Sequence, residues 1–168
     1  MSDGPNITVS RQGGDWFRIL GNSDDIVENA ARAAWKAAAT DDTLARDCEI
    51  SIALADNALV RALNRDYRGR DRATNVLSFP AGDPGAPGRP RLIGDAVLAL
   101  ETVEAEASEA GRPVVDHVTH LVVHGVLHLL GYDHETEADA AVMETLEIDV
   151  LAGLGIENPY ILVEQPAG

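Results

Sequence analysis

The chain has 168 residues, of which 45% are hydrophobic and 24% charged, so it can bury a core of its own as one domain spanning residues 1–168. It contains no run of about 18 apolar residues, which excludes a membrane-spanning helix. Its first residues, Met1–Asn6, lack the basic start and apolar core of a signal peptide. The single cysteine, Cys48, excludes an internal disulfide. These features predict a cytoplasmic protein.

The formal net charge of −15 is unfavourable for binding a nucleic acid, but the charge is unevenly distributed. The acidic residues gather in segments 101–109 and 135–149, which we interpret as solvated helix faces. Arginine is the side chain best suited to paired contacts with phosphate. An acidic body could therefore carry one basic patch, with an exposed loop as the alternative interpretation. The clustered arginines are Arg61, Arg65, Arg68, Arg70 and Arg72.

The first third of the chain predicts a strand, a second short strand, a helix and a third strand. Residues 7–10 and 16–20 have the apolar character of short strands. Ser23–Asp25 offers a helix cap and early negative charge, which predicts an alanine-rich helix to about Ala39. The alternation over Cys48–Leu54 predicts a half-buried strand that contains an inert, buried thiol.

Around the middle of the chain we expect a helix, a short strand and a loop. Asp56 is suited to cap a helix that ends near Tyr67. Val76–Phe79 predicts a short strand stopped by Pro80. Residues 81–90 are rich in glycine and proline and predict a mobile surface loop. The residues of the helix expected to face inward are Leu59, Val60 and Leu63.

The last part predicts one strand, Leu92–Ala99, followed by an acidic helix to about Ala110 with Gly111 just past its end. Pro113 then suits the first turn of a helix to Leu130 that is apolar almost all round, and such a helix is central in a fold. A final helix spans about residues 135–152, and residues 165–168 are expected to be disordered. The whole pattern predicts an α+β fold: a small mixed sheet packed with about five helices.

Three histidines in the segment His124–His134 are spaced by four and six residues. His124 and His128 would share one face of the central helix, one turn apart. Gly131 can adopt the left-handed conformation that ends a helix, so His134 could return to the same ion. Three neutral nitrogen ligands with an open fourth position are typical of a catalytic zinc. The sequence therefore predicts one zinc ion per chain.

Two further histidines lie on the same helix. His120 extends the row to i, i+4, i+8, but a straight helix separates its first and third members by about 12 Å, too far for one ion. We therefore expect His120 to pack beside the site or support a ligand, and His117 to lie at the surface or at the rim. Three imidazoles also suit nickel, copper or iron, so the sequence alone does not fix the metal.

The spacing H-x3-H-x2-G-x2-H is that of the metzincin peptidases, which place a glutamate directly after the first histidine as general base. Here that position is Gly125, which cannot move a proton. Losing a general base costs about two to four orders of magnitude in rate. A metallopeptidase is thus supported by the metal spacing and disfavoured by the missing glutamate.

Three other segments join the histidine block in a common resemblance: Leu63–Gly69, Thr74–Pro80 and Gly94–Asp95. Together with His124–His134 they closely resemble the YbeY family of bacterial rRNA maturation factors, viewed as single-strand-specific, metal-dependent endoribonucleases. The resemblance covers about residues 50–155. It implies maturation of the 16S rRNA 3′ end and ribosome quality control, with single-stranded rRNA and the ribosome or its proteins as partners.

The same resemblance implies that His124, His128 and His134 are the zinc ligands and that Arg68 faces the metal across a cleft. Arg68 would pair with a phosphate and offset charge that grows in the transition state. The chain departs from the family at Asn75, where an aspartate is common.

Several roles stay open from the sequence. Asp133 either orients an imidazole or caps the following helix, and Tyr132 and Phe79 either stack on an RNA base or pack in the core. The nucleophile is either zinc-activated water or the 2′-hydroxyl of the RNA, and no residue stands out as a dedicated base. A ribosome-assembly protein with a structural zinc is the main alternative to an enzyme.

Overall fold

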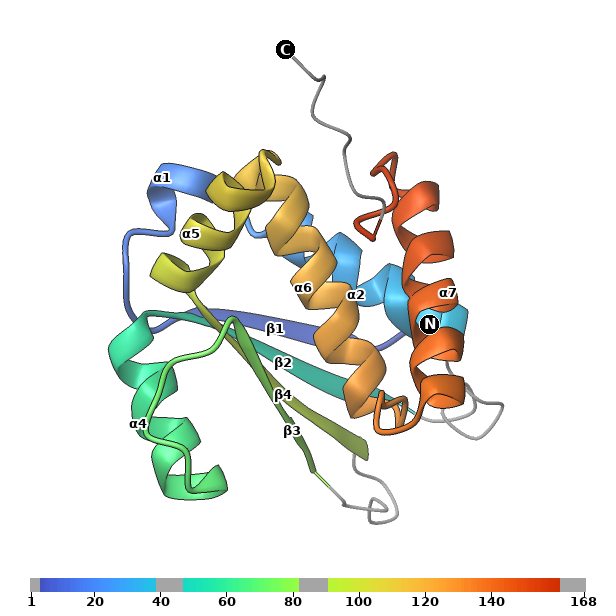
Figure 1. The fold of residues 1–168 in the computed structure, drawn as a ribbon, viewed down its shortest axis with the longest axis horizontal. Coiled ribbons are helices and arrows are strands. Elements are labelled where there is room, and N and C mark those ends of the chain that lie inside the picture. Colours follow the sequence, from blue (N-terminus) through green and yellow to red (C-terminus); the bar gives the residue numbers. More distant parts are fainter. Residues whose placement is uncertain (1–3, 39–46, 82–90, 161–168) are drawn as a thin grey trace.

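The computed structural model describes residues 4–38, 47–81 and 91–160 (Figure 1). At its centre is a four-stranded sheet in the order β1-β2-β4-β3. Strands β1, β2 and β4 are parallel, and β3 is an antiparallel edge strand beside β4. The mixed sheet of the predicted α+β fold is therefore confirmed. The strands are β1 (Asn6–Arg11), β2 (Cys48–Ala55), β3 (Val76–Pro80) and β4 (Arg91–Ala99).

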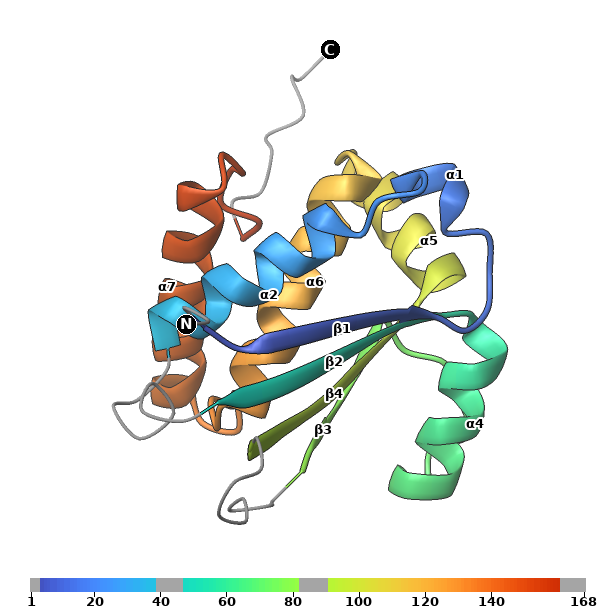
Figure 2. The same cartoon turned by 180° about the vertical axis from the view of Figure 1, so that it is seen from behind.

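The described residues form six helices, one more than expected. Helices α2 and α6 cover one face of the sheet, α7 packs against both of them, and α4 lies on the other side of the sheet (Figures 1 and 2). None of the described helices is long and apolar enough to cross a membrane. The helices are α1 (Phe17–Leu20), α2 (Asp25–Ala38), α4 (Asn57–Arg68), α5 (Leu100–Ala110), α6 (Val114–Leu129) and α7 (Glu137–Gly153).

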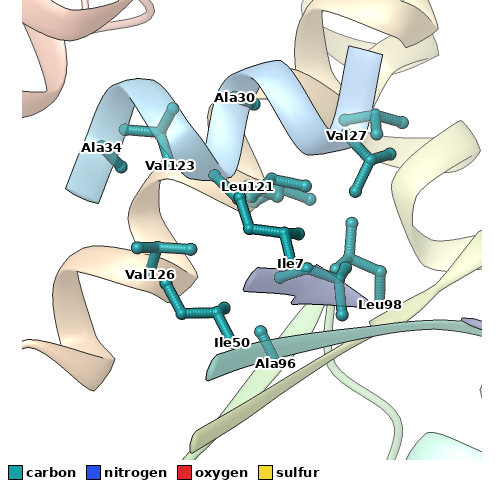
Figure 3. Packing of buried hydrophobic residues seen from close by; sticks show 14 of the residues in the cluster. Ile7, Val27, Ala30, Ala34, Ile50, Ala96, Leu98, Leu121, Val123 and Val126 are labelled. Carbon is teal, nitrogen blue, oxygen red and sulfur yellow. The ribbon is translucent and has the colours of Figure 1, made fainter. Parts of the chain in front are cut away.

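The alternation of β2 divides the core between the two faces of the sheet, because successive strand side chains point to opposite sides. Ile50, Ile52 and Leu54 are fully buried in the main core under α2 and α6. Figure 3 shows Ile50 and Ala96 of the sheet facing the side chains of α6. A smaller apolar cluster on the opposite face packs under α4, and consists of Ala55, Val60, Leu77, Val97 and Ala99.

Helix α6 is the central helix that its apolar sequence predicts. Pro113 is its N-cap, and its buried residues occupy almost all sides of the helix. The helix ends at Leu129, one residue before the predicted end, and Gly131 follows with φ of 103°. The predicted cap at Asp56 is confirmed: its side chain accepts a hydrogen bond from the backbone N–H of Leu59 at 2.9 Å. In the segment predicted to cap α2, Ser23 Oγ accepts from the backbone N–H of Asp25 at 3.2 Å, and the carbonyl oxygen of Asp24 accepts from the backbone N–H of Glu28 at 2.9 Å.

One predicted strand is wrong. Residues 16–20 contain the short helix α1 instead of a strand. Trp16 is only 1% exposed, and its indole N–H donates to the carbonyl oxygen of Ala55 at 2.9 Å. A short apolar run has too few residues to show the hydrophobic periodicity that distinguishes a helix from a strand. The local conformation here therefore depends on a partner that is distant in the sequence. The loop predicted at residues 81–90 and the tail predicted at 165–168 lie almost wholly or wholly outside the described residues.

Gly94 in β4 lets the sheet and α6 approach closely. Its φ is 147°, and a β-carbon there would lie 2.4 Å from the carbonyl oxygen of Phe79 and 2.8 Å from Leu129 Cδ2. We expect Gly94→Ala to lower the free energy of unfolding by about 3 kcal/mol, from backbone strain and overpacking. Gly153→Ala, at an open position in α7, is the control and should change it by less than about 0.5 kcal/mol in urea unfolding. Equal stability of the two variants would contradict this account.

Candidate metal centre

The structure brings the three histidines of the motif together. His124 and His128 lie one turn apart on α6 with ring centroids 4.6 Å apart. The chain reverses at Gly131, and the ring of His134 then lies 5.6 Å from that of His124 and 4.9 Å from that of His128. One ligand nitrogen from each ring lies within 4.8 Å of the other two. The local helix period and one glycine turn are sufficient to build this cluster.

The donor set fits a divalent transition metal. His124 Nε2 and His128 Nε2 face each other at 3.1 Å, as two nitrogens directed at one ion would. Burial, followed by the nearby charges of His124 and His134, lowers the pKa of His128 to about 4. His128 is therefore neutral near pH 7, and a neutral imidazole is the form that binds a metal. Three imidazole ligands suit zinc with an open coordination position.

Behind the cluster, a carboxylate of α7 supports His124. His124 Nδ1 hydrogen-bonds to Oε1 of Glu147, and the hydroxyl of Tyr160 donates to Oε2. The sequence predicts a solvated acidic helix face that includes Glu147; for this residue the prediction is wrong, because Glu147 is 0% exposed. Burial alone would raise the pKa of Glu147, but the nearby imidazole of His120, the hydrogen bonds with His124 and Tyr160 and the charge of His124 lower it to about 2. The carboxylate is thus ionised inside the protein.

Sequence reasoning missed Glu147 and Tyr160 as members of the site. A signal for Glu147 was present: it lies four residues after Met143 and three before Val150, both buried on the inner face of α7. An acidic residue at a helical spacing between buried apolar residues needs a partner in the interior. Tyr160 gave no such signal, because it follows α7 in an irregular segment.

The two other histidines of α6 line a second hollow of about 520 Å³. His117 Nε2 hydrogen-bonds to Glu106 Oε1 at 2.9 Å, and Asn75 Nδ2 donates to the same oxygen at 3.0 Å. His120 Nε2 lies 3.8 Å from Glu147 Oε2, which agrees with the expected position of His120 beside the site. Asn75 and His124 line both this hollow and the larger cleft in front of the three-histidine cluster.

That larger cleft, of about 700 Å³, places arginines and histidines in one space. Arg68, at the end of α4, donates from Nη2 to the carbonyl oxygen of Ser78 at 2.7 Å, and its guanidinium carbon lies 5.6 Å from the ring centroid of Phe79. The structure thus brings Arg68 and the three histidines into a common cleft. The residues that line it are Asn64, Arg68, Arg70, Arg72, Thr74, Asn75, Val76, Leu77, Ser78, Pro80, His124, His128 and His134.

The predicted arginine patch divides into two groups. Arg61 forms an ion pair with Asp71 at 2.7 Å, and Arg65 with Asp66 at 3.1 Å. These two are not among the residues that line the cleft, whereas the three remaining arginines of the patch are. The basic surface relevant to the site is therefore narrower than the sequence cluster.

Gly125 stands where a metzincin has its glutamate, and it packs closely against the sheet. A β-carbon at Gly125 would lie 3.3 Å from both Ala96 Cβ and Val76 Cγ2. In addition, Ser78 Oγ donates to the carbonyl oxygen of Gly125 at 3.1 Å. This face of α6 lies directly against the sheet, so a side chain there would require its neighbours to shift by a few tenths of an ångström. The position that holds the general base in metzincins serves close packing here.

The remaining candidate residues make packing or local contacts. Tyr132 is half-buried against the main core, and Phe79 meets Tyr67 edge-on with centroids 5.7 Å apart. Asp133 Oδ1 accepts from the backbone N–H of Glu135 at 3.3 Å. Asp133 is not the cap of α7, because the capping side chain is that of Thr136.

Fold and site together describe a small α+β protein with an open three-histidine centre beside an arginine-lined cleft. The family model described as Endoribonuclease YbeY matches residues 20–155. The chain belongs to the YbeY family.

Relatives and a solved structure agree with this assignment. A protein of Paramagnetospirillum magneticum named Endoribonuclease YbeY is 58% identical over 67% of this chain and 71% of its own length. One of the same name from Parvibaculum lavamentivorans is 47% identical over 94% of this chain and 85% of its own length. The solution structure of a Thermotoga maritima protein shares the fold, with a TM-score of 0.53 and 23% identity over 89% of this chain and 91% of that one.

Asn64 holds the loop that carries two of the cleft arginines. It is buried, its Nδ2 donates to the carbonyl oxygen of Arg72 at 2.9 Å, and its own carbonyl accepts from the backbone N–H of Arg70 at 3.2 Å. We expect Asn64→Ala to cost about 1–2 kcal/mol of stability, because it leaves a backbone carbonyl without its partner. Hydrogen exchange of amides 69–75 should accelerate, while Asp66→Ala on the exposed side of α4 should leave it unchanged. Unchanged exchange in Asn64→Ala would show that the loop is held otherwise.

Proposed function

We propose that this protein is a zinc-dependent endoribonuclease that cuts single-stranded rRNA in the cytoplasm. Its task would be maturation of the 16S rRNA 3′ end and ribosome quality control, in contact with the ribosome or its proteins. The observation that carries the proposal is one cleft lined by both the three-histidine cluster and three arginines. The names of the relatives, Endoribonuclease YbeY, support the same activity.

The histidines His124, His128 and His134 would hold one zinc ion per chain. Zinc bound there supplies a Lewis acid that polarises phosphoryl oxygens and lowers the pKa of water. Three protein ligands leave a coordination position free, and this favours catalysis over a purely structural ion. The fit of the cluster to one metal therefore favours the enzyme over an assembly protein with a structural zinc.

Arg68 would bind the phosphate that is cut. Its guanidinium group has five N–H donors. One of them donates to the carbonyl oxygen of Ser78, and this hydrogen bond fixes the orientation of the guanidinium group. A fixed guanidinium pairs with phosphate oxygens and offsets the charge that grows on them in the transition state. Arg70 and Arg72 add positive charge to the same cleft and would guide the RNA backbone.

The nucleophile is either water or the 2′-hydroxyl of the RNA. The peptidase base is absent at Gly125, and the sheet packs against that position. The same packing counts against peptide hydrolysis by this site.

Metal binding provides a first test. After exhaustive dialysis against zinc at low concentration, the wild type should retain one equivalent per chain, measured by atomic emission. His134→Ala should retain much less, because the ion loses one of its three ligands. His117→Ala, whose ring pairs with Glu106 instead, should retain as much as wild type. Equal zinc content of the His134→Ala variant and the wild type would refute the assigned ligand set.

Cleavage of a single-stranded RNA from the 3′ end of a 16S rRNA precursor tests the activity. Arg68→Ala should lower kcat/KM on the order of a hundredfold, since it removes a donor to the developing charge. Arg65→Ala, an exposed residue on the same helix, should stay within about twofold of wild type. His128→Ala should abolish cutting.

Two other outcomes of the cleavage assay have definite meanings. Equal cutting by the wild type and His128→Ala would reveal a contaminating nuclease. A wild type that holds zinc and binds ribosomes without cutting would instead favour the assembly protein with a structural zinc.

A further inference from the structure

Glu147 is a charged group in a place where charge is costly. Its side chain is fully buried between α6 and α7, and transferring a carboxylate from water to such a site is unfavourable unless its oxygens are well paired. Both oxygens are paired: Oε1 with His124 Nδ1, and Oε2 with the hydroxyl of Tyr160. The arrangement therefore satisfies the buried carboxylate and connects it to the imidazole of His124.

The two ring nitrogens of His124 face different partners. One ring nitrogen, Nε2, faces His128 Nε2 at 3.1 Å, on the side of the histidine cluster. The other, Nδ1, faces Glu147. In a neutral imidazole only one nitrogen carries a proton, and a carboxylate partner draws that proton to its own side. Nε2 of His124 is then left with a free lone pair on the side of the cluster.

We propose that Glu147 is the positioning residue of the metal centre. Its carboxylate accepts the Nδ1 proton of His124, selects the tautomer that offers Nε2 to the ion, and fixes the plane of the ring. Tyr160 in turn orients the carboxylate. This inference rests on the proposed function in one respect, namely that the three histidines bind a metal.

A second ion in this region is a weaker explanation of the same residues. His120, His124 and Glu147 also have ligand atoms within 4.8 Å of one another. An ion there, in addition to one at the three histidines, would need both nitrogens of His124 to be deprotonated. The hydrogen bond to Glu147 needs only the ordinary neutral ring and leaves Glu147 satisfied by Tyr160. One ion and one supporting carboxylate account for the contacts of both nitrogens of His124.

Zinc affinity tests the proposal. Glu147→Gln keeps the size of the side chain and an acceptor oxygen but removes the negative charge. We expect its zinc dissociation constant, measured by competition with a chelating dye, to rise roughly 10- to 100-fold. Glu144→Gln is the matched control, because Glu144 lies one turn earlier on α7 and is exposed. Far-ultraviolet circular dichroism checks that both metal-free variants are folded.

A spectroscopic measurement on the unmodified protein covers the case in which Glu147→Gln does not fold. In the zinc-loaded wild type, two-bond nitrogen–proton correlation spectra of the histidine rings should show His124 protonated at Nδ1, with slow exchange of that proton. Coordination of zinc through Nδ1 of His124, or a deprotonated Nδ1, would overturn the proposal.

The outcomes separate this inference from the proposed function. Absence of zinc binding by the wild type would overturn the metal centre and, with it, the role of Glu147. Equal zinc affinity in the wild type and in folded Glu147→Gln would overturn the role of Glu147 alone. Weaker binding in Glu147→Gln together with the Nδ1-protonated ring supports it.

Discussion

The candidate site depends on the close contact between α6 and the edge of the sheet. Gly125 lets the helix approach Val76 and Ala96, and Ser78 Oγ donates to the carbonyl oxygen of Gly125. The carbonyl group of the same serine accepts the hydrogen bond from Arg68. Ser78 therefore connects the helix that carries the histidines to the arginine at the end of α4. A bulkier residue in this contact would move the two halves of the cleft relative to each other.

The distribution of charge explains how an acidic protein can present a cleft lined by arginines. The formal charge of −15 belongs to the whole chain, but fields from exposed charges decay over about 8 Å at physiological salt. Two arginines of α4, Arg61 and Arg65, pair with nearby carboxylates. Arg68, at the C-terminal end of the same helix, lines the cleft. The position of the positive surface therefore depends on which arginines pair with a neighbouring carboxylate, and the net charge of the chain does not reveal it.

The parts of the structure that the sequence predicts are those set by local rules. His124 and His128 follow from the helix period, and Gly131 gives the turn that brings His134 back. The failures depend on partners far away in sequence. Trp16 is held by a carbonyl of β2, which turns an apparent strand into a helix. Glu147 belongs to an acidic helix; its spacing from Met143 and Val150 places it on the inner face, but its partner, His124, is seen only once α7 packs on α6.

Asn75, which the resemblance in the sequence marks as a departure from an aspartate, fits its surroundings in this chain as an amide. Its Oδ1 accepts from the backbone N–H of Val76 at 2.7 Å, and its Nδ2 donates to Glu106. An aspartate could make only the first contact, since an ionised carboxylate has no donor and would face the carboxylate of Glu106. Glu106 also pairs with His117 on α6. The amide thus links the start of β3 to α5 and α6 at the boundary between the two hollows, a place where an aspartate would lie against the carboxylate of Glu106.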